Sequence, residues 1–317
     1  FNINKKDKFG VFEVGMNKAG EINYLTKIIK PNVGVITNIS YAHIKNFKNL
    51  KGIAKAKSEI IDNITENGTL VINSDDQFFR YLKLKALKNK LKIISFGTKN
   101  KPNIMLKKIK KNKKSSYIFL DFNGKELKFL INKNLEIYKE NFIASLAVIS
   151  IYFNLNNISE KFFYNYNIPE GRGDQSFIKF KKKKIQLIDE SYNSNPSSLK
   201  FAIDKFNNLN SKSNKKIILL GDMLELGKFS KKLHIEAAKI INKSNINEIY
   251  VYGKKVIETF NKIRPQKRGR ILNSKKDILE FFNNDIKNGN YLMIKGSYST
   301  GLNSITKNLK SGRLSAL

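Results

Sequence analysis

Two patterns of apolar residues alternate along the chain: short continuous runs, and stretches in which apolar residues recur every three or four positions. The first pattern is typical of strands in a buried parallel sheet, and the second of helices that cover such a sheet. In the first half we predict strands at residues 11–14, 33–37, 69–73 and 92–96, and helices at 21–29, 52–64, 77–87 and 141–153. This order predicts a doubly wound α/β domain.

The pattern changes between residues 103 and 131, where three short runs alternate apolar and polar positions. The pair Asn123-Gly124 lies between two of these runs, and Asn-Gly is a signal for a two-residue hairpin turn. We therefore expect a small antiparallel patch within the first domain.

Turn-forming residues gather at 168–173, after which the α/β alternation starts again. The second half predicts strands at 184–188, 216–220, 248–252 and 291–294, and helices at 197–207, 231–241, 254–262, 276–286 and 302–309. The predicted fold class is α/β, with two doubly wound, mainly parallel-sheet domains at residues 1–168 and 169–317. In such sheets ligands bind at the carboxyl ends of the strands, so polar residues that follow a strand are the candidates for function.

The composition narrows the class of protein. A chain of 317 residues that is 41% hydrophobic can bury two cores. It has no run of eighteen apolar residues, and its first residues lack the features of a signal peptide, so we expect no membrane span and a cytoplasmic location. Since there is no cysteine, disulfides, thiolate metal sites and cysteine nucleophiles are excluded.

The formal net charge of +34 is the strongest compositional anomaly. A nucleic-acid-binding protein would explain it. The lysines are, however, spread among many asparagine and isoleucine residues, and A/T-rich codons encode all three types. The dense run at 107–114 fits a solvated hairpin and lacks interleaved aromatic residues. We expect no specific nucleic-acid partner, and keep nucleic-acid binding as the alternative from another functional class.

Two residues that follow neighbouring strand-like runs could share one Mg²⁺ ion. Glu13 lies in an apolar run, where an ionised carboxylate either needs a partner such as a metal or reaches solvent at the end of the strand. His43 follows the run at 33–37 and is either a ligand or a hydrogen-bonded loop residue. Oxygen is the more usual ligand for Mg²⁺ than imidazole.

Lys57 lies on an apolar stripe of the helix predicted at 52–64, whereas Lys55 points away from it. The stripe consists of Ile53, Ala56, Ile60, Ile61 and Ile64. One interpretation is that the lysine stem covers the stripe and the ammonium reaches water. The other is a lysine with a lowered pKa, or one converted to an anionic carbamate, near a metal.

In the second half, residues 189–198 follow a strand and open a helix. Asn195 suits the N-cap and Pro196 the first helical position, so the segment could serve helix initiation alone. The same segment offers a carboxylate, two amides and free helix N–H groups, which could line a ribose and a phosphate. The glycine-containing strand ends at 221–227 and 295–297 are weak signals when each is taken alone.

Taken in order, these segments resemble the Mur ligase family of ATP-dependent amide-forming enzymes. Resemblance to its central domain is carried by Glu13-Val14-Gly15-Met16-Asn17, Gly20-Glu21-Ile22, Thr37-Asn38-Ile39, Ala42-His43 and residues 52–60. Resemblance to its carboxyl-terminal domain is carried by Tyr192-Asn193-Ser194-Asn195-Pro196, residues 221–227 and Lys295-Gly296-Ser297. The string Gly-Asp-Met-Leu-Glu-Leu-Gly at 221–227 is similar to that of the members that add D-alanyl-D-alanine.

The resemblance implies a role for each motif residue. Glu13 and His43 would bind Mg²⁺, and Lys57 would be the carbamylated lysine that supports the metal. The remaining positions would bind substrates: ATP at Asn38, Arg172, Asp189, Asn193 and Asn195, and the incoming amino substrate at Lys295 and Ser297. By the same resemblance residues 1–168 are the central ATPase domain and residues 169–317 the carboxyl-terminal Rossmann-like domain.

The implied enzyme joins D-alanyl-D-alanine to UDP-N-acetylmuramoyl-tripeptide for peptidoglycan synthesis. It would use ATP as a substrate and Mg²⁺ as a cofactor, and it would be a monomer. A substrate carboxylate attacks the γ-phosphate of ATP, and the amine then attacks the carbonyl of the acyl phosphate. A sibling ligase, which adds a single amino acid to the muropeptide or glutamate to folate, is the alternative within the family.

Three departures from the family pattern affect these expectations. The sequence contains no Gly-x-x-x-x-Gly-Lys-[Ser/Thr] phosphate loop. Gly15 and Gly20 have the required spacing, but Glu21 stands where the loop needs lysine. In the family that loop and a UDP-binding domain precede the part matched here, so we expect an incomplete copy that is inactive by itself, or a non-catalytic remnant. Tyr298 stands where arginine is usual, and Asp174 opens a segment that is commonly basic.

Overall fold

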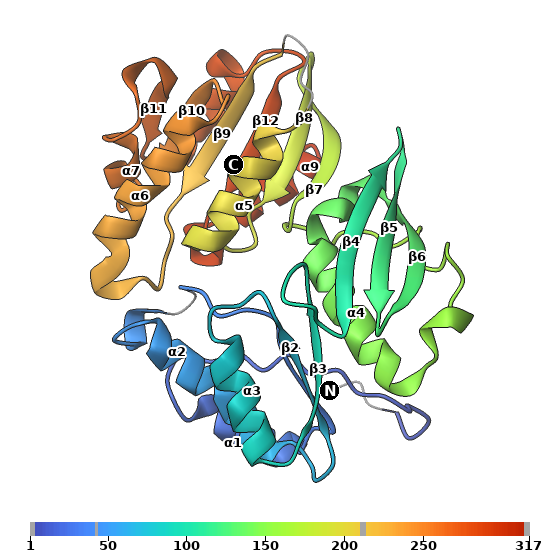
Figure 1. Cartoon of the computed structure of the whole chain (residues 1–317). Helices are drawn as coiled ribbons and strands as arrows, with labels where there is room; N and C mark the ends of the chain where they lie inside the picture. The colour runs from blue at the N-terminus through green and yellow to red at the C-terminus, as the bar shows by residue number, and fades with distance from the viewer. Residues whose placement is uncertain (1–3, 42–43, 210–213, 314–317) are drawn as a thin grey trace. The chain divides into compact units, whose positions relative to one another are not determined.

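The computed structural model describes residues 4–41, 44–209 and 214–313. The chain divides into two compact units, Phe1–Asn165 (unit 1) and Tyr166–Leu317 (unit 2), and each contains one six-stranded sheet (Figure 1). Helices alternate with the strands in both, so the predicted α/β fold class is confirmed. None of the helices in the described parts of the chain is both long and apolar enough to cross a membrane.

The sheet of unit 1 has the order β1-β2-β3-β4-β5-β6. Its strands are β1 (Val33–Ile36), β2 (Thr69–Asn73), β3 (Lys92–Gly97), β4 (Ile104–Lys111), β5 (Ser115–Phe122) and β6 (Lys125–Asn132). Strands β1 to β4 pair in parallel, whereas β4, β5 and β6 pair antiparallel. Asn123 and Gly124 have φ values of +51° and +86°, as a two-residue hairpin turn requires. The predicted antiparallel patch is therefore confirmed.

The helices of unit 1 are α1 (Glu21–Ile29), α2 (Leu50–Lys57), α3 (Phe79–Lys88) and α4 (Lys139–Tyr152), with short 3₁₀ turns at Ile44–Asn46, Ser58–Asn63, Lys133–Tyr138 and Leu155–Asn157. The prediction of a single helix at 52–64 is wrong in one respect, because the α-helix changes to a 3₁₀ helix at Ser58. There the Ser58 hydroxyl donates a hydrogen bond of 2.7 Å to the Lys55 carbonyl. Such a local side-chain bond competes with regular helix geometry.

The strand predicted at residues 11–14 is also wrong. This segment forms no strand, and the order of the sheet begins with β1. The Val11 side chain is 98% exposed. An apolar run becomes a strand only where a neighbour pairs with its backbone, and β1 does not pair with this run.

The sheet of unit 2 has the order β11-β10-β9-β12-β8-β7. Its strands are β7 (Asp174–Phe180), β8 (Lys183–Glu190), β9 (Lys216–Gly221), β10 (Glu248–Tyr252), β11 (Arg268–Leu272) and β12 (Tyr291–Lys295). All pairs are parallel except β7 with β8. The sequence did not predict β7 and β11, which are the two edge strands.

Helices cover both faces of this second sheet. They are α5 (Pro196–Asn207), α6 (Ser230–Lys243), α7 (Ile257–Phe260), α8 (Lys275–Glu280) and α9 (Leu302–Lys310), with short turns at Gly227–Phe229, Pro265–Lys267, Phe281–Asp285 and Tyr298–Thr300. One core packs the sheet against α8, the π turn after it and α9. Helices α5 and α6 contact each other and bury an apolar side of their own. The helix predicted at 254–262 shortens to four residues, and the one at 276–286 ends in the π turn.

Candidate functional site

In unit 1, the segment that follows β1 lies against helix α2. The Lys57 ammonium donates a hydrogen bond of 2.9 Å to the backbone carbonyl of Asn38, so the structure brings together two predicted site residues. Lys57 is partly buried, whereas Lys55 on the same helix is exposed. The ammonium therefore binds a protein carbonyl, which neither interpretation of the sequence had included.

Asp76, which the sequence analysis missed, lies close to the same segment. Its carboxylate accepts hydrogen bonds from the backbone N–H groups of Ile39 at 2.7 Å and Phe78 at 2.8 Å. Burial lowers the pKa of Lys57 below its usual value of 10.5, and the negative charge of Asp76 acts in the opposite direction. Asp76 thus fixes the backbone beside Asn38 and places a carboxylate near the lysine.

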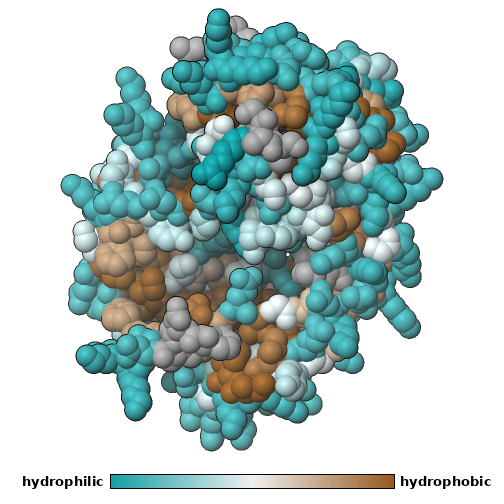
Figure 2. All heavy atoms as spheres, turned by 180° about the vertical axis from the view of Figure 1, so that it is seen from behind, coloured by the Kyte–Doolittle hydropathy of each residue, from teal (hydrophilic) through white to brown (hydrophobic). Residues whose placement is uncertain are grey.

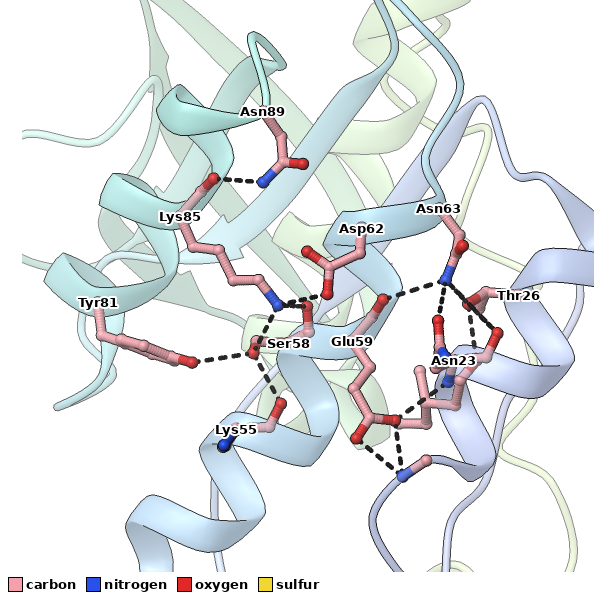
Figure 3. Close-up of polar contacts among 12 residues, drawn as sticks. Asn23, Thr26, Lys55, Ser58, Glu59, Asp62, Asn63, Tyr81, Lys85 and Asn89 are labelled. Carbon is pink, nitrogen blue, oxygen red and sulfur yellow. Dashed lines mark hydrogen bonds and ion pairs between the residues drawn. The ribbon is translucent and has the colours of Figure 1, made fainter.

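Figure 3 shows the polar contacts that hold the end of helix α2 in place. The Glu59 carboxylate accepts hydrogen bonds from the backbone N–H groups of Gly20 at 2.8 Å and Asn23 at 3.1 Å, at the start of α1. On the other side, Lys85 of α3 forms an ion pair of 2.7 Å with Asp62 and donates to the Ser58 carbonyl at 2.8 Å. Helices on two sides therefore fix the turn that follows Lys57.

The predicted metal ligands are not assembled by the described residues. Glu13 is exposed in an irregular segment, and its carboxylate is the type of ligand that Mg²⁺ prefers. His43 lies outside the described residues, so the predicted pair is not placed. Within the ranges that the structure describes, no three His, Cys, Asp or Glu side chains form a metal-binding group. One exposed carboxylate does not by itself make a magnesium site.

In unit 2, three predicted segments meet where β8, β9 and β12 end. These strands are neighbours in the sheet, in the order β9-β12-β8. The Ser297 hydroxyl accepts a hydrogen bond from the Leu224 N–H at 2.9 Å and donates one to the Ser194 carbonyl at 3.2 Å. Ser297 thus joins the segments at 189–198, 221–227 and 295–297 through its own hydroxyl group.

Lys295 lies at the centre of this edge and is 1% exposed. Its ammonium lies 3.5 Å from a carboxylate oxygen of Glu190 and donates to the Asn193 carbonyl at 3.0 Å. Burial lowers the pKa of Lys295, and Glu190 partly offsets that effect. Among the described side chains, Glu190 Oε1 and Ser194 Oγ are buried without a hydrogen-bond partner. The sequence analysis identified Lys295 but missed its partner, Glu190.

Asp189 is buried and belongs to an ionic network with two partly buried residues. Its carboxylate accepts hydrogen bonds from the Ser191 N–H at 3.0 Å and the Ser191 hydroxyl at 2.6 Å. The Lys310 ammonium lies 2.7 Å from Asp189 and 2.7 Å from Asp174. Asp174 therefore has a defined partner, although it opens a segment that is commonly basic in the family that the sequence resembles.

The segment 171–173 is tied to the same network. The Asp174 carboxylate accepts a hydrogen bond of 2.7 Å from the Gly171 N–H. Gly171 has a φ of +72°, which favours glycine. Next to it, the guanidinium carbon of Arg172 lies 4.2 Å from the centre of the Tyr192 ring, within cation–π distance. Arg172 thus lies on the same edge as Asp189.

The two predicted asparagines of unit 2 differ in what they bind. Asn195 is the N-cap of α5 and forms a capping box with Ser198, and Pro196 is the first helical residue, so the helix-initiation interpretation is confirmed. Asn193 is exposed, and its side-chain oxygen accepts a hydrogen bond of 2.7 Å from the Ser194 N–H. Both side-chain oxygens therefore already order the segment that follows β8.

His234 on α6 supports the segment at 221–227 and is 1% exposed. Its Nε2 accepts a hydrogen bond from the Met223 N–H at 3.1 Å, so its Nδ1 carries the proton and donates to the Ser230 carbonyl at 2.8 Å. The imidazole is therefore neutral and has a structural role, and burial lowers its pKa below the usual 6.5.

We expect unit 2 to lose stability as the pH falls below 6.5, because the unfolded chain then protonates His234 while the folded chain resists protonation. Thermal unfolding followed by circular dichroism between about pH 7.5 and pH 5.5 measures this dependence, a range in which ordinary carboxylates stay ionised. His234→Gln should flatten it, and substitution of the other histidine, His43→Gln, should leave it unchanged. An equal pH dependence in wild type and His234→Gln would contradict the assignment.

Comparison with known proteins identifies the class of these two units. Residues 1–149 match the model of the Mur ligase middle domain, and residues 177–298 match that of the Mur ligase glutamate ligase domain. The two units are therefore the middle and carboxyl-terminal domains of a Mur-type ligase. The chain belongs to the Mur ligase family.

Two relatives that bear the same enzyme name match almost the whole chain. The UDP-N-acetylmuramoyl-tripeptide–D-alanyl-D-alanine ligase of Buchnera aphidicola subsp. Baizongia pistaciae is 31% identical over 97% of this chain and 65% of the relative. The Bacillus subtilis ligase of the same name is 27% identical over 97% of this chain and 65% of its own length. The chain thus spans about two thirds of these relatives.

A solved structure shows the same fold. MurF from Acinetobacter baumannii has a TM-score of 0.83 and 25% sequence identity, and the match covers 98% of this chain and 66% of that one. A MurF ligase from Thermotoga maritima in complex with ADP has a TM-score of 0.77 at 21% identity, over 96% of this chain and 67% of that one.

Proposed function

We propose that this chain is the central and carboxyl-terminal part of an ATP-dependent ligase that joins D-alanyl-D-alanine to UDP-N-acetylmuramoyl-tripeptide. The observation that carries the proposal is the assembly of the three family segments by Ser297 and Lys295 at the ends of β8, β9 and β12. Relatives that match 97% of this chain bear the name of this ligase. A sibling ligase is less well supported, because the string at 221–227 resembles that of the dipeptide-adding members.

In unit 2, Arg172 and the segment after β8 would bind the nucleotide. The Arg172 guanidinium lies over the Tyr192 ring, where it can pair with a phosphate while the aromatic ring supports it. The network of Lys310, Asp174 and Asp189 keeps the backbone of both segments in place. Asp189, Asn193 and Asn195 would then act mainly by shaping the segment that faces the nucleotide.

Lys295 and Ser297 would serve the amino substrate. Lys295 is held by Glu190 and the Asn193 carbonyl, so its charge is fixed at the strand ends. A fixed cation lowers the energy of the negative charge that develops when an amine attacks an acyl phosphate. Glu190 Oε1, a buried acceptor without a partner, lies beside that cation.

In unit 1, Lys57, Asn38 and Glu13 would serve the phosphate-transfer step. We infer that Lys57 carries a carbamate, because burial lowers its pKa and the neutral amine is the form that reacts with carbon dioxide. Glu13 and His43 would hold Mg²⁺, which neutralises charge on the phosphates of ATP when it is bound. Asn38 would contact ATP while its carbonyl orients Lys57.

The proposal is tested by joining residues 1–317 to the preceding third of the Bacillus subtilis relative and measuring phosphate release from ATP with UDP-N-acetylmuramoyl-tripeptide. We expect turnover with D-alanyl-D-alanine and none with L-alanine or D-glutamate. Turnover with a single amino acid instead would assign a sibling ligase, and a folded chimera that turns over with no amine would contradict the proposal.

Residues 1–317 alone are the control for the same assay. We expect no steady turnover of ATP, because the printed sequence contains no Gly-x-x-x-x-Gly-Lys-[Ser/Thr] loop to hold the triphosphate. Steady ligation by this chain alone would contradict the interpretation as an incomplete copy.

A further inference from the structure

The hairpin of β7 and β8 carries a dense group of lysines that the ligase function does not use. Strand β7 ends at Phe180 and β8 begins at Lys183, so Lys181 and Lys182 form the turn. A cavity of about 280 Å³ lies along this hairpin. It is lined by Phe177, Ile178, Lys179, Lys182, Lys183 and Lys184, and no carboxylate is among them.

The register of the hairpin places like charges together. Lys179 and Lys184 are directly opposite each other across the two strands, and both are exposed. Like charges in this position destabilise a strand pair. Within the described residues, no carboxylate lies within ion-pair distance of Lys179, Lys182 or Lys184. A bound anion would relieve this repulsion.

The other two lysines of the hairpin have structural partners. Lys183 donates to the carbonyls of Phe282 at 2.9 Å and Asn283 at 2.6 Å, and Lys181 donates to the Asn283 side chain at 2.5 Å. Asp285 is the nearby carboxylate, and it pairs with Arg270 at 2.7 Å. The charges available to a ligand are therefore those of Lys179, Lys182 and Lys184.

An aromatic ring lies beside these charges. The Phe177 side chain is 68% exposed, and the Lys184 ammonium lies 4.8 Å from the centre of its ring. The sequence analysis found no aromatic residue interleaved with the lysines in the run at 107–114. In this hairpin Phe177 and Lys179 lie two residues apart on β7, and the pairing of β7 with β8 places Lys184 on the same face.

This hairpin is separate from the nucleotide segment of unit 2. Strand β8 begins at Lys183 in the hairpin and ends at Glu190 beside Lys295. Seven residues of extended strand span about 23 Å at about 3.3 Å per residue. The cavity and the predicted ATP-binding residues therefore lie at opposite ends of one strand.

We propose that the β7–β8 hairpin binds single-stranded nucleic acid. The three available lysines would bind successive phosphates, and an unpaired base would stack on Phe177, which is how proteins bind single strands without reading sequence. Hydrophilic residues are spread over the face in Figure 2, so a hydrophilic surface alone does not mark a site. A single exposed ring in a concave site fits a base better than a lipid surface, which needs a larger apolar area.

Binding of a fluorescein-labelled 12-nucleotide oligo(dT) or oligo(U) to the 317-residue chain, measured by fluorescence anisotropy at several salt concentrations, tests the proposal. Lys179→Gln/Lys184→Gln should weaken binding and reduce the slope of log affinity against log salt by about 1.4, since each phosphate contact on a single strand contributes about 0.7. Phe177→Ala should weaken binding about fivefold or more at every salt concentration, because it removes a stacking contact and no charge.

A matched control variant tests whether binding depends on this hairpin or only on the net charge of the chain. Lys110→Gln/Lys113→Gln removes two exposed charges from the β4–β5 hairpin and changes the net charge by the same amount. Circular dichroism of each variant checks its folding. Equal loss of affinity in the two double variants, or no effect of Phe177→Ala, would overturn the proposal.

Three competitors distinguish the ligand. We expect an excess of ADP or of duplex DNA to displace little of the bound oligonucleotide. We also expect vesicles of phosphatidylserine and phosphatidylcholine to bind the chain no more tightly than the oligonucleotide does. Displacement by ADP would assign binding to the nucleotide segment, and preferential binding to vesicles would assign a membrane contact; either result would overturn the proposal. None of these measurements depends on ligase activity, so their outcome is independent of the proposed function.

Discussion

Replacement of Lys310 by methionine is expected to lower the free energy of unfolding of unit 2 by about 3 kcal/mol, the lower end of the usual cost of removing one partner from a buried ion pair, because the Lys310 and Asp174 side chains are each 20% exposed. The Lys310 ammonium lies 2.7 Å from both Asp174 and Asp189, and the Asp189 side chain is 5% exposed. Without the lysine, two carboxylates stay close together with no cation between them. Urea unfolding followed by circular dichroism measures the change.

Lys307→Met is the matched control, because Lys307 lies on the same helix, α9, and is exposed. It makes the same change of side chain and charge, and we expect an effect within about 0.5 kcal/mol, as for most surface substitutions. Lys310→Arg should retain more of the stability than Lys310→Met. If Lys310→Met costs no more than Lys307→Met, the network does not stabilise unit 2.

The central strands of both sheets were predictable because they are buried on both faces. Strands β2 and β9, for example, are buried along their whole length and show as continuous apolar runs. The edge strands β7 and β11 did not show this signal. Strand β7 mixes Asp, Gln, Ser and Lys with its apolar residues, and β11 contains two arginines and a glycine. An edge strand is partly exposed, so its sequence resembles that of a loop.

The segment at 11–14 shows the opposite error. Its apolar pattern is that of a strand, but strand formation depends on a neighbouring backbone that the local pattern does not encode. The same limit applies to the turn of the β7–β8 hairpin, where Lys181 has a φ of +52° and no Asn-Gly signal marks the turn. Local sequence thus specified most elements but not which ones pair.

The candidate site was predictable as a set of motifs and not as a set of contacts. Lys295 and Asp189 were recognised, but Glu190 contacts Lys295 and Lys310 contacts Asp189 from distant parts of the chain. Lys295 and Glu190 are 105 residues apart, and Lys310 and Asp174 are 136 residues apart. The pairing of β12 with β8 brings Lys295 beside Glu190, and helix α9 brings Lys310 to Asp174 and Asp189.

Lys57→Met is expected to abolish turnover by the chimeric ligase and to remove a carbamate signal from the 317-residue chain. In the carbamate the amine lone pair attacks carbon dioxide, an N–C bond forms and one proton leaves, so the reaction needs a neutral amine. Burial lowers the pKa of Lys57, which favours that form. The Asn38 carbonyl, which accepts a hydrogen bond from the ammonium, would accept one from the remaining N–H of the carbamate. Carbon-13 NMR of the chain in labelled bicarbonate measures the signal directly.

The alternative, in which the stem of Lys57 covers the apolar stripe and its ammonium stays charged, makes the opposite prediction. Methionine would then cover Ile53 and Ile61 as well as lysine does, so the chimera would keep its activity and its stability. Lys55→Met is the control, because Lys55 is exposed on the same helix and has no part in either interpretation. Full activity and an unchanged carbon-13 spectrum in Lys57→Met, with folding intact by circular dichroism, would refute the carbamate.

Because Asp76 favours the charged ammonium, Asp76→Asn should increase the carbamate signal if the carbamate forms, and have no effect on the spectrum if it does not.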